Sequence, residues 1–185
     1  MLLISEASGG ANSAIDYDTD AAINGGIVIA AGSAAMAESF GSNSTQCALL
    51  YGFENVQAAG TRLTLLDEDN TVIASFAPAQ AYECVEISAP AMALNSTLTL
   101  ATGGNCTETD AYGLARGGTL RGAASTASIT LEAVNTIAGA IQEGRFGFGH
   151  GKGGQTPQER GDRPAFPNGE MPAGGEPPAL PDGAV

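Results

Sequence analysis

The segment that decides the fold is Asn12–Ser33, with the sequence NSAIDYDTDAAINGGIVIAAGS. It contains a short extended run, an acidic turn, a Gly-Gly corner and a second extended run, an order typical of one coil of a parallel β-solenoid. Gly25 and Gly26 can adopt left-handed backbone angles at the corner without steric cost. Because a coil cannot bury its apolar face alone, we expect either that upstream coils are missing from the sequence or that the coil is capped in another way.

Residues 35–143 have the pattern of antiparallel strands. Thr61–Leu66 and Thr71–Phe76 are two alternating runs, and the segment Asp67–Asn70 between them, with three acidic residues and an asparagine, predicts the turn of a β-hairpin. Further strands are predicted at Cys47–Phe53, Tyr82–Ser88, Thr97–Thr102 and Ser128–Val134. Strands at this spacing, with turn signals between them, predict a small β-sandwich.

The composition changes again in residues 144–185. Seven of the nine prolines lie there, together with many glycines and few β-branched residues. Such a segment cannot bury enough apolar surface to offset the entropy of ordering. We therefore expect an all-β chain in three parts: the terminal turn or turns of a right-handed parallel β-helix in residues 1–34, an antiparallel β-sandwich in 35–143, and a disordered Gly/Pro-rich tail in 144–185.

The net charge of −13 excludes several classes of partner. Nucleic acid and anionic lipid both need a basic surface, so neither is an expected partner. No apolar run reaches the length of a transmembrane helix; the longest is Ile27–Ala31, so we expect no membrane insertion. An acidic surface suits cations, although acidity alone also keeps a protein soluble.

The three cysteines have no spacing typical of a zinc site. Cys47 and Cys84 each fall within a predicted strand and could pair across a sheet in a secreted protein, which would leave Cys106 over. Small buried thiols with one exposed thiol are an equally good interpretation.

Several segments together resemble a known family. Asp16–Asp18 with its flanking Ala14-Ile15, Ile23–Gly26 and Ala30–Ser33 come first, and the likeness continues to the tail. Further matching segments are Met36–Glu38, Ser44–Gln46, Ala58–Thr61, Phe76–Ala79, Val85–Pro90, Thr102–Gly104 and Pro178–Gly183. In order and spacing they are similar to a bacterial carbohydrate-binding domain family with pectate-lyase-like β-helices, whose members are secreted or surface-attached.

The resemblance implies binding of plant-type polysaccharide, including acidic pectic chains, with calcium held by the β-helix. It also implies an extracellular or cell-surface location, with the export signal upstream of this sequence. Members of the family carry many Gly-Gly-Thr-type coils upstream, whereas this chain has at most one or two. Ligand and calcium sites on those coils would then be absent from this chain.

Asp16, Asp18 and Asp20 are the candidate metal ligands. In an extended strand alternate residues share a face, so three carboxylates could line up there, and calcium prefers oxygen ligands. A solvated acidic edge is the alternative. Tyr17, between two of these aspartates, is the candidate carbohydrate-binding residue. The other aromatic candidates for sugar stacking, each also explained by core packing, are Phe40, Tyr51, Phe53, Phe76, Tyr82 and Tyr112.

Catalysis is not expected. Pectate lyases resembling this fold use a basic residue beside calcium, but Arg62, Arg116 and Arg121 lie outside the Asp16–Asp20 segment. The one histidine, His150, lies in the predicted tail, so no triad is expected.

Two functions remain. The first is an extracellular, non-catalytic carbohydrate-binding module for plant or cell-wall polysaccharide, with calcium assisting the binding of acidic chains. The second is a structural C-terminal cap of a β-helix surface protein, without a ligand of its own.

Overall fold

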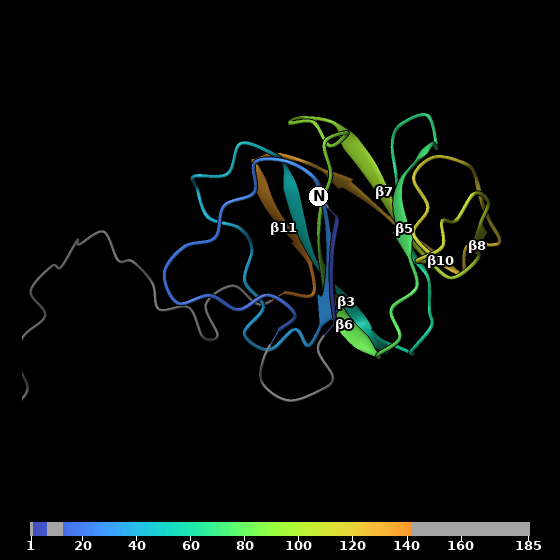
Figure 1. Ribbon diagram of the computed structural model, residues 1–185, viewed down its shortest axis with the longest axis horizontal. Coiled ribbons are helices and arrows are strands. Elements are labelled where there is room, and N and C mark those ends of the chain that lie inside the picture. Colours follow the sequence, from blue (N-terminus) through green and yellow to red (C-terminus); the bar gives the residue numbers. More distant parts are fainter. Residues whose placement is uncertain (1, 7–12, 142–185) are drawn as a thin grey trace, which may run out of the picture. The chain divides into compact units, whose positions relative to one another are not determined.

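Strands, turns and loops, and no helix, make up the part of the chain that the computed structural model describes, residues 2–6 and 13–141 (Figure 1). The predicted all-β fold is confirmed for these residues. They belong to one compact unit of the chain. The predicted tail, residues 144–185, lies outside the described residues.

The larger sheet, sheet A, has five strands in the order β1-β2-β6-β3-β11. The middle strand β6 runs antiparallel to both of its neighbours, whereas each edge strand runs parallel to the strand beside it. The strands are β1 (Leu2–Glu6), β2 (Ile27–Gly32), β6 (Tyr82–Ser88), β3 (Ala48–Gln57) and β11 (Asn135–Gly139).

The second sheet, sheet B, has four strands in the order β10-β7-β4-β5, and all of its pairs are antiparallel. A short two-stranded ladder of β8 and β9 lies within the segment that connects β7 to β10. The strands are β10 (Ser125–Thr130), β7 (Thr97–Thr102), β4 (Leu63–Leu66), β5 (Val72–Phe76), β8 (Asn105–Cys106) and β9 (Leu120–Arg121).

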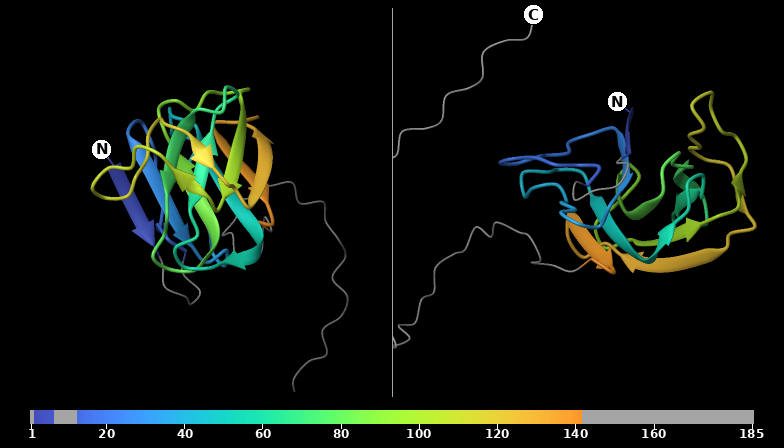
Figure 2. Two further views of the ribbon diagram at one scale, coloured as in Figure 1. Left: turned by 90° about the vertical axis from the view of Figure 1, so that its right-hand side faces the viewer. Right: turned by 90° about the horizontal axis from the view of Figure 1, so that it is seen from below.

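Sheets A and B contribute side chains to one hydrophobic core. Ile29, Leu49 and Ile87 come from sheet A, and Leu65 and Leu100 come from sheet B. β10 in sheet B leads directly into β11 in sheet A, so the chain passes from one sheet to the other at this point (Figure 2). The aliphatic residues of the predicted strands therefore explain how the two sheets are held together.

The predicted hairpin is confirmed: β4 and β5 pair antiparallel. Asp67 closes the turn, because its Oδ1 accepts hydrogen bonds from the backbone N–H groups of Asp69 and Thr71 at 3.0 and 2.8 Å. Asn70 has a φ of 60°, a conformation that asparagine tolerates better than most residues. Turn chemistry thus accounts for Asp67 and Asn70, whereas Glu68 Oε1 accepts a hydrogen bond of 3.0 Å from the backbone N–H of Thr97 in β7.

The interpretation of Asn12–Ser33 as a β-solenoid coil that is separate from the sandwich needs correction. β2, its apolar part, pairs parallel with β1 but antiparallel with β6, a strand of the region predicted as a separate sandwich. The expected boundary after residue 34 therefore falls between strands of one sheet: β1 and β2 precede it, and β3, β6 and β11 follow it. Val28 and Ile29 are both buried, so β2 is apolar on both faces and its sequence does not specify the direction of its partners.

The face of sheet A that points away from the shared core is covered by loops. Ile23, Val28 and Ala48 form a second small cluster on this face, and Ile15 and Phe40 pack against it. The cover comes from the segments 13–26 and 33–46, which flank β2. β6 is consequently buried on both faces.

Candidate functional site

The three predicted metal ligands do not share a strand face. Asp16, Asp18 and Asp20 are all exposed, and no strand includes them. Asp20 Oδ2 accepts a hydrogen bond of 2.8 Å from Asn43 Nδ2. In residues 2–6 and 13–141, no group of three or more His, Cys, Asp or Glu side chains could hold a metal ion. The calcium prediction assumed that residues 16–20 form an extended strand, and the structure forms no strand there.

Tyr17, the predicted sugar-binding residue, ties the two covering loops together. Its hydroxyl donates a hydrogen bond to the carbonyl oxygen of Ser39, and its side chain is half-buried. Burial raises the pKa of the Tyr17 hydroxyl, and the carboxylates of Glu38, Asp20 and Glu86 raise it further. These contacts explain Tyr17 as part of the loop packing.

The most unusual side chain beneath these loops is Glu86, which the sequence analysis did not single out. It lies in the middle of β6, between Ala30 of β2 and Leu50 of β3, and only 2% of its surface is exposed. Ser39 Oγ donates a hydrogen bond to Glu86 Oε1 at 3.1 Å, and the backbone N–H of Phe40 also donates to this carboxylate. Glu86 Oε2 has no partner among the described residues.

Burial raises the pKa of Glu86 to about 8, although its hydrogen bonds to Ser39 and Phe40 act in the opposite direction. The carboxyl group is therefore mostly protonated at neutral pH. Its sequence signal was weak: in YECVEIS a glutamate at an alternate position also fits a solvent-facing residue. The cover comes from segments more than 40 residues away, so burial could not be read locally.

Two further buried oxygens near the same cover lack partners among the described residues: Glu38 Oε2 and Asn135 Oδ1. Asn135 Nδ2 donates to the carbonyl oxygen of Gly41 at 2.8 Å. Segment 38–41 is thus hydrogen-bonded to two strands of sheet A, to β6 through Glu86 and to β11 through Asn135. These contacts hold the loop against sheet A. A bound water can satisfy the buried oxygens that lack a partner, and at a carboxyl group a proton can do so.

The cysteines are unpaired. Cys47 and Cys84 are buried free thiols and Cys106 is partly exposed. Cys84 Sγ donates to the carbonyl oxygen of Ser33, and burial raises the pKa of this thiol to about 11. The interpretation of these residues as small buried thiols is therefore the one that the structure supports.

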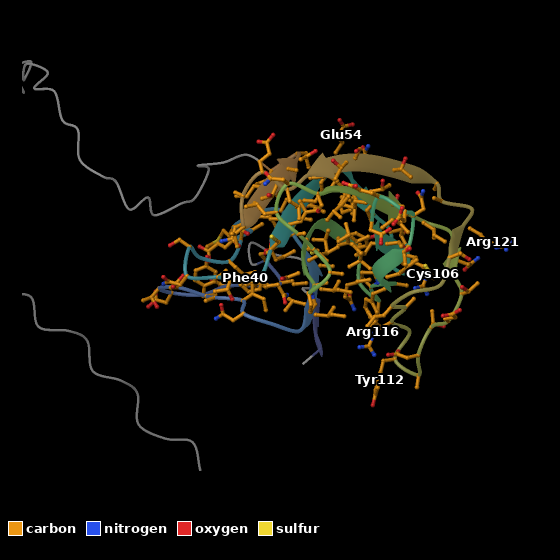
Figure 3. All side chains as sticks on the ribbon, turned by 90° about the horizontal axis from the view of Figure 1, so that it is seen from above. Phe40, Glu54, Cys106, Tyr112, Arg116 and Arg121 are labelled. Carbon is orange, nitrogen blue, oxygen red and sulfur yellow. The ribbon has the colours of Figure 1, made fainter. Side chains whose placement is uncertain are left out.

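A second notable feature is the turn around Tyr112, a residue that is 79% exposed, the largest fraction of any large hydrophobic residue in the described part of the chain. Asp110 Oδ1 accepts hydrogen bonds from the backbone N–H groups of Tyr112 and Leu114, at 2.8 and 3.1 Å. In Figure 3, Tyr112 and Arg116 both project from this loop away from the sheets.

The three arginines of the described residues, which the sequence placed outside the Asp16–Asp20 segment, belong to the 103–122 segment or contact it. Arg62 Nη1 donates to the carbonyl oxygen of Gly113 and to Ser75 Oγ, and Arg116 and Arg121 are exposed within residues 103–122. His150 lies outside the described residues.

No helix in the described part of the chain is long and apolar enough to cross a membrane. The search of family models, of curated proteins and of solved structures found no match to this chain.

Proposed function

We propose that this chain is a structural cap, in which a stack of parallel β-coils ends and passes into a small β-sandwich. One observation carries this proposal: β2 pairs parallel with β1 on one edge and antiparallel with β6 on the other. The pairing with β1 has a constant offset of 25 residues, from Leu2 to Ile27 and from Glu6 to Ala31 (27 − 2 and 31 − 6).

This offset falls within the 20–50-residue periods of repeat folds, in which each coil places a strand beside the equivalent strand of the next. A parallel pair also requires a crossover that brings the chain back to the same end of the sheet, as one coil does. β6 interrupts the stack because it runs in the opposite direction. The outer edge of β1 has no strand beside it among the described residues, and a preceding coil is its proposed partner.

A graft tests the cap. Residues 1–143 are fused in register behind a parallel β-solenoid from which the native C-terminal cap has been deleted. We expect the fusion to be monomeric and soluble, because β2 and β6 close the open end. The matched control lacks residues 1–26, which removes β1 and the crossover. A fusion that aggregates as readily as the uncapped solenoid would refute the proposal.

A second candidate function is non-catalytic, extracellular binding of acidic plant or cell-wall polysaccharide. It is favoured by the position of the described arginines: Arg62, Arg116 and Arg121 all lie at the 103–122 loop of a chain with a net charge of −13. The resemblance noted in the sequence supports the same ligand class. The segment Asn12–Ser33 does not support it, because β2 belongs to sheet A.

Retention on immobilised polygalacturonate tests this second function. The assay is run with millimolar calcium and with a chelator, because the exposed aspartates 16, 18 and 20 could bridge through calcium to an acidic sugar. We expect retention in at least the calcium condition. Absence of retention in both conditions would exclude binding of this polysaccharide.

A further inference from the structure

The Tyr112 turn presents an aromatic ring to solvent on a backbone that is fixed from several sides. Asp110 Oδ1 binds the N–H groups of Tyr112 and Leu114. Leu114 is 1% exposed, and Ala115 exchanges two backbone hydrogen bonds with Ser75 of β5, at 3.0 and 2.9 Å. The backbone that carries the ring is therefore held in place on both sides of Tyr112.

The side of the turn that faces β4 is held by a guanidinium group. Arg62 Nη1 lies 3.4 Å from the carbonyl oxygen of Gly113 and 3.2 Å from Ser75 Oγ. Gly113 has a φ of 79°, which a glycine adopts without strain. A preformed turn of this kind lowers the entropy lost when a ligand stacks on the ring.

The charge of this region differs from that of the rest of the described chain. Its three cationic side chains, Arg62, Arg116 and Arg121, belong to this loop or contact it. The Asp110 carboxylate is engaged by the turn, and Glu108 is the loop's other acidic side chain, exposed and at a φ of 64°. Three cationic and two acidic side chains thus give the loop and Arg62 a small positive balance, in a chain whose net charge is −13.

We infer that Tyr112 and Arg116 form a binding platform for one uronate residue of an acidic polysaccharide. The apolar C–H face of the sugar ring stacks on the Tyr112 ring, and the Arg116 guanidinium pairs with the sugar carboxylate. An aromatic ring and a guanidinium that project from the same loop match a ligand with one apolar face and one carboxylate, whereas a neutral sugar would use the ring alone. This inference rests on the second function proposed above and names its site.

The test measures retention of the full chain on polygalacturonate and on a neutral polysaccharide, at low salt and with a chelator present. We expect retention on polygalacturonate without calcium, since the guanidinium supplies the positive charge. Tyr112→Ala and Arg116→Gln should each weaken binding about tenfold, the size of a typical interface anchor. Val56→Ala, which truncates another exposed apolar side chain, is the matched control and should bind as the wild type does.

Glu108→Gln gives an opposite expectation, because it removes the free carboxylate of the loop and should strengthen binding. If the wild type is retained but Tyr112→Ala and Arg116→Gln bind equally well, the platform is wrong while polysaccharide binding stands. If the wild type is not retained in the presence of the chelator, the platform is wrong, and polysaccharide binding itself is excluded only when retention also fails with calcium. Loss of binding to the neutral polysaccharide as well in Arg116→Gln would contradict the role of the guanidinium.

Discussion

Ser39 Oγ donates a hydrogen bond to Glu86 Oε1 across 3.1 Å, and this contact joins a covering loop to the middle strand of sheet A. Glu86 is 2% exposed, and its other carboxylate oxygen has no partner among the described residues. The titratable groups that interact with Glu86 include Tyr17 from a covering loop and Cys84 from its own strand, neither of which is cationic at neutral pH. Glu86 is therefore most stable in its protonated form.

The first prediction concerns pH. The pKa of Glu86 rises from 4.5 to about 8 on folding. Between these two pH values Glu86 is protonated in the folded chain and ionised in the unfolded chain. The free energy of unfolding therefore falls by about 1.4 kcal/mol for each unit by which the pH rises. The stabilisation is complete below pH 4.5 and is lost as the pH rises through about 8.

Urea unfolding at pH 5, 6, 7, 8 and 9 measures this slope. Glu86→Gln keeps the shape of the side chain and cannot ionise, so we expect it to be less dependent on pH and to become more stable than the wild type above pH 8. Glu132→Gln, at an exposed glutamate, is the matched control and should retain the wild-type slope. An unchanged slope in Glu86→Gln would show that other groups cause the pH dependence.

The second prediction concerns the anchoring of the loop. Ser39→Ala removes the hydroxyl that donates to Glu86 and should lower the free energy of unfolding by about 1 kcal/mol. Ser42→Ala, in the same loop but at an exposed position, should change it by less than about 0.5 kcal/mol. Equal effects of the two substitutions in urea unfolding would argue against a specific role of the Ser39–Glu86 contact.

The third prediction separates Tyr17 from ligand binding. Tyr17→Phe removes the hydroxyl that donates to the carbonyl oxygen of Ser39, and should cost about 1 kcal/mol of stability. Its retention on polygalacturonate should equal that of the wild type, because the ring is part of the loop packing. Tyr112→Phe serves as the control for stability and should leave it unchanged. Weaker retention of Tyr17→Phe than of the wild type would show that the Tyr17 hydroxyl takes part in sugar binding.

Local patterns predicted the strands of this fold well. Tyr82–Ser88 and Thr97–Thr102 have the same bounds as β6 and β7, since apolar runs bounded by Pro90 and Gly103 are local signals. The hairpin of β4 and β5 was equally accessible, because its turn residues carry their own hydrogen bonds. The predicted strand at Ser128–Val134 lies partly in β10 and ends before β11 begins.

The pairing of β2 and the burial of Glu86 could not be predicted from local sequence patterns. β2 is apolar on both faces, and such a strand fits a parallel or an antiparallel neighbour equally well. Glu86 is buried by Ser39 and Phe40, which are 47 and 46 residues away along the chain (86 − 39 and 86 − 40). For Asp16, Asp18 and Asp20 the local pattern was misleading. Their alternation predicted a strand, but the three residues lie in a loop that the Tyr17–Ser39 hydrogen bond joins to the neighbouring loop.

The last prediction concerns the edge of sheet A, where Gly139 of β11 lies opposite Gly52 of β3. Gly139 has a φ of 73°, and a Cβ added to it would overlap the carbonyl oxygen of Gly52 and lie 3.0 Å from the Tyr51 ring. Gly139→Ala should therefore lower the free energy of unfolding by at least about 2 kcal/mol, since backbone strain and overlap add.

Gly25→Ala is the matched control, because φ at Gly25 is not positive and nothing lies within 4 Å of an added Cβ. Its stability should be unchanged or raised by up to about 1 kcal/mol, because alanine restricts the unfolded chain. Hydrogen exchange of the β11 amides adds a local readout: it should accelerate in Gly139→Ala and not in Gly25→Ala. If both variants unfold at the same urea concentration as the wild type, β11 is not held against β3 by this close glycine pair.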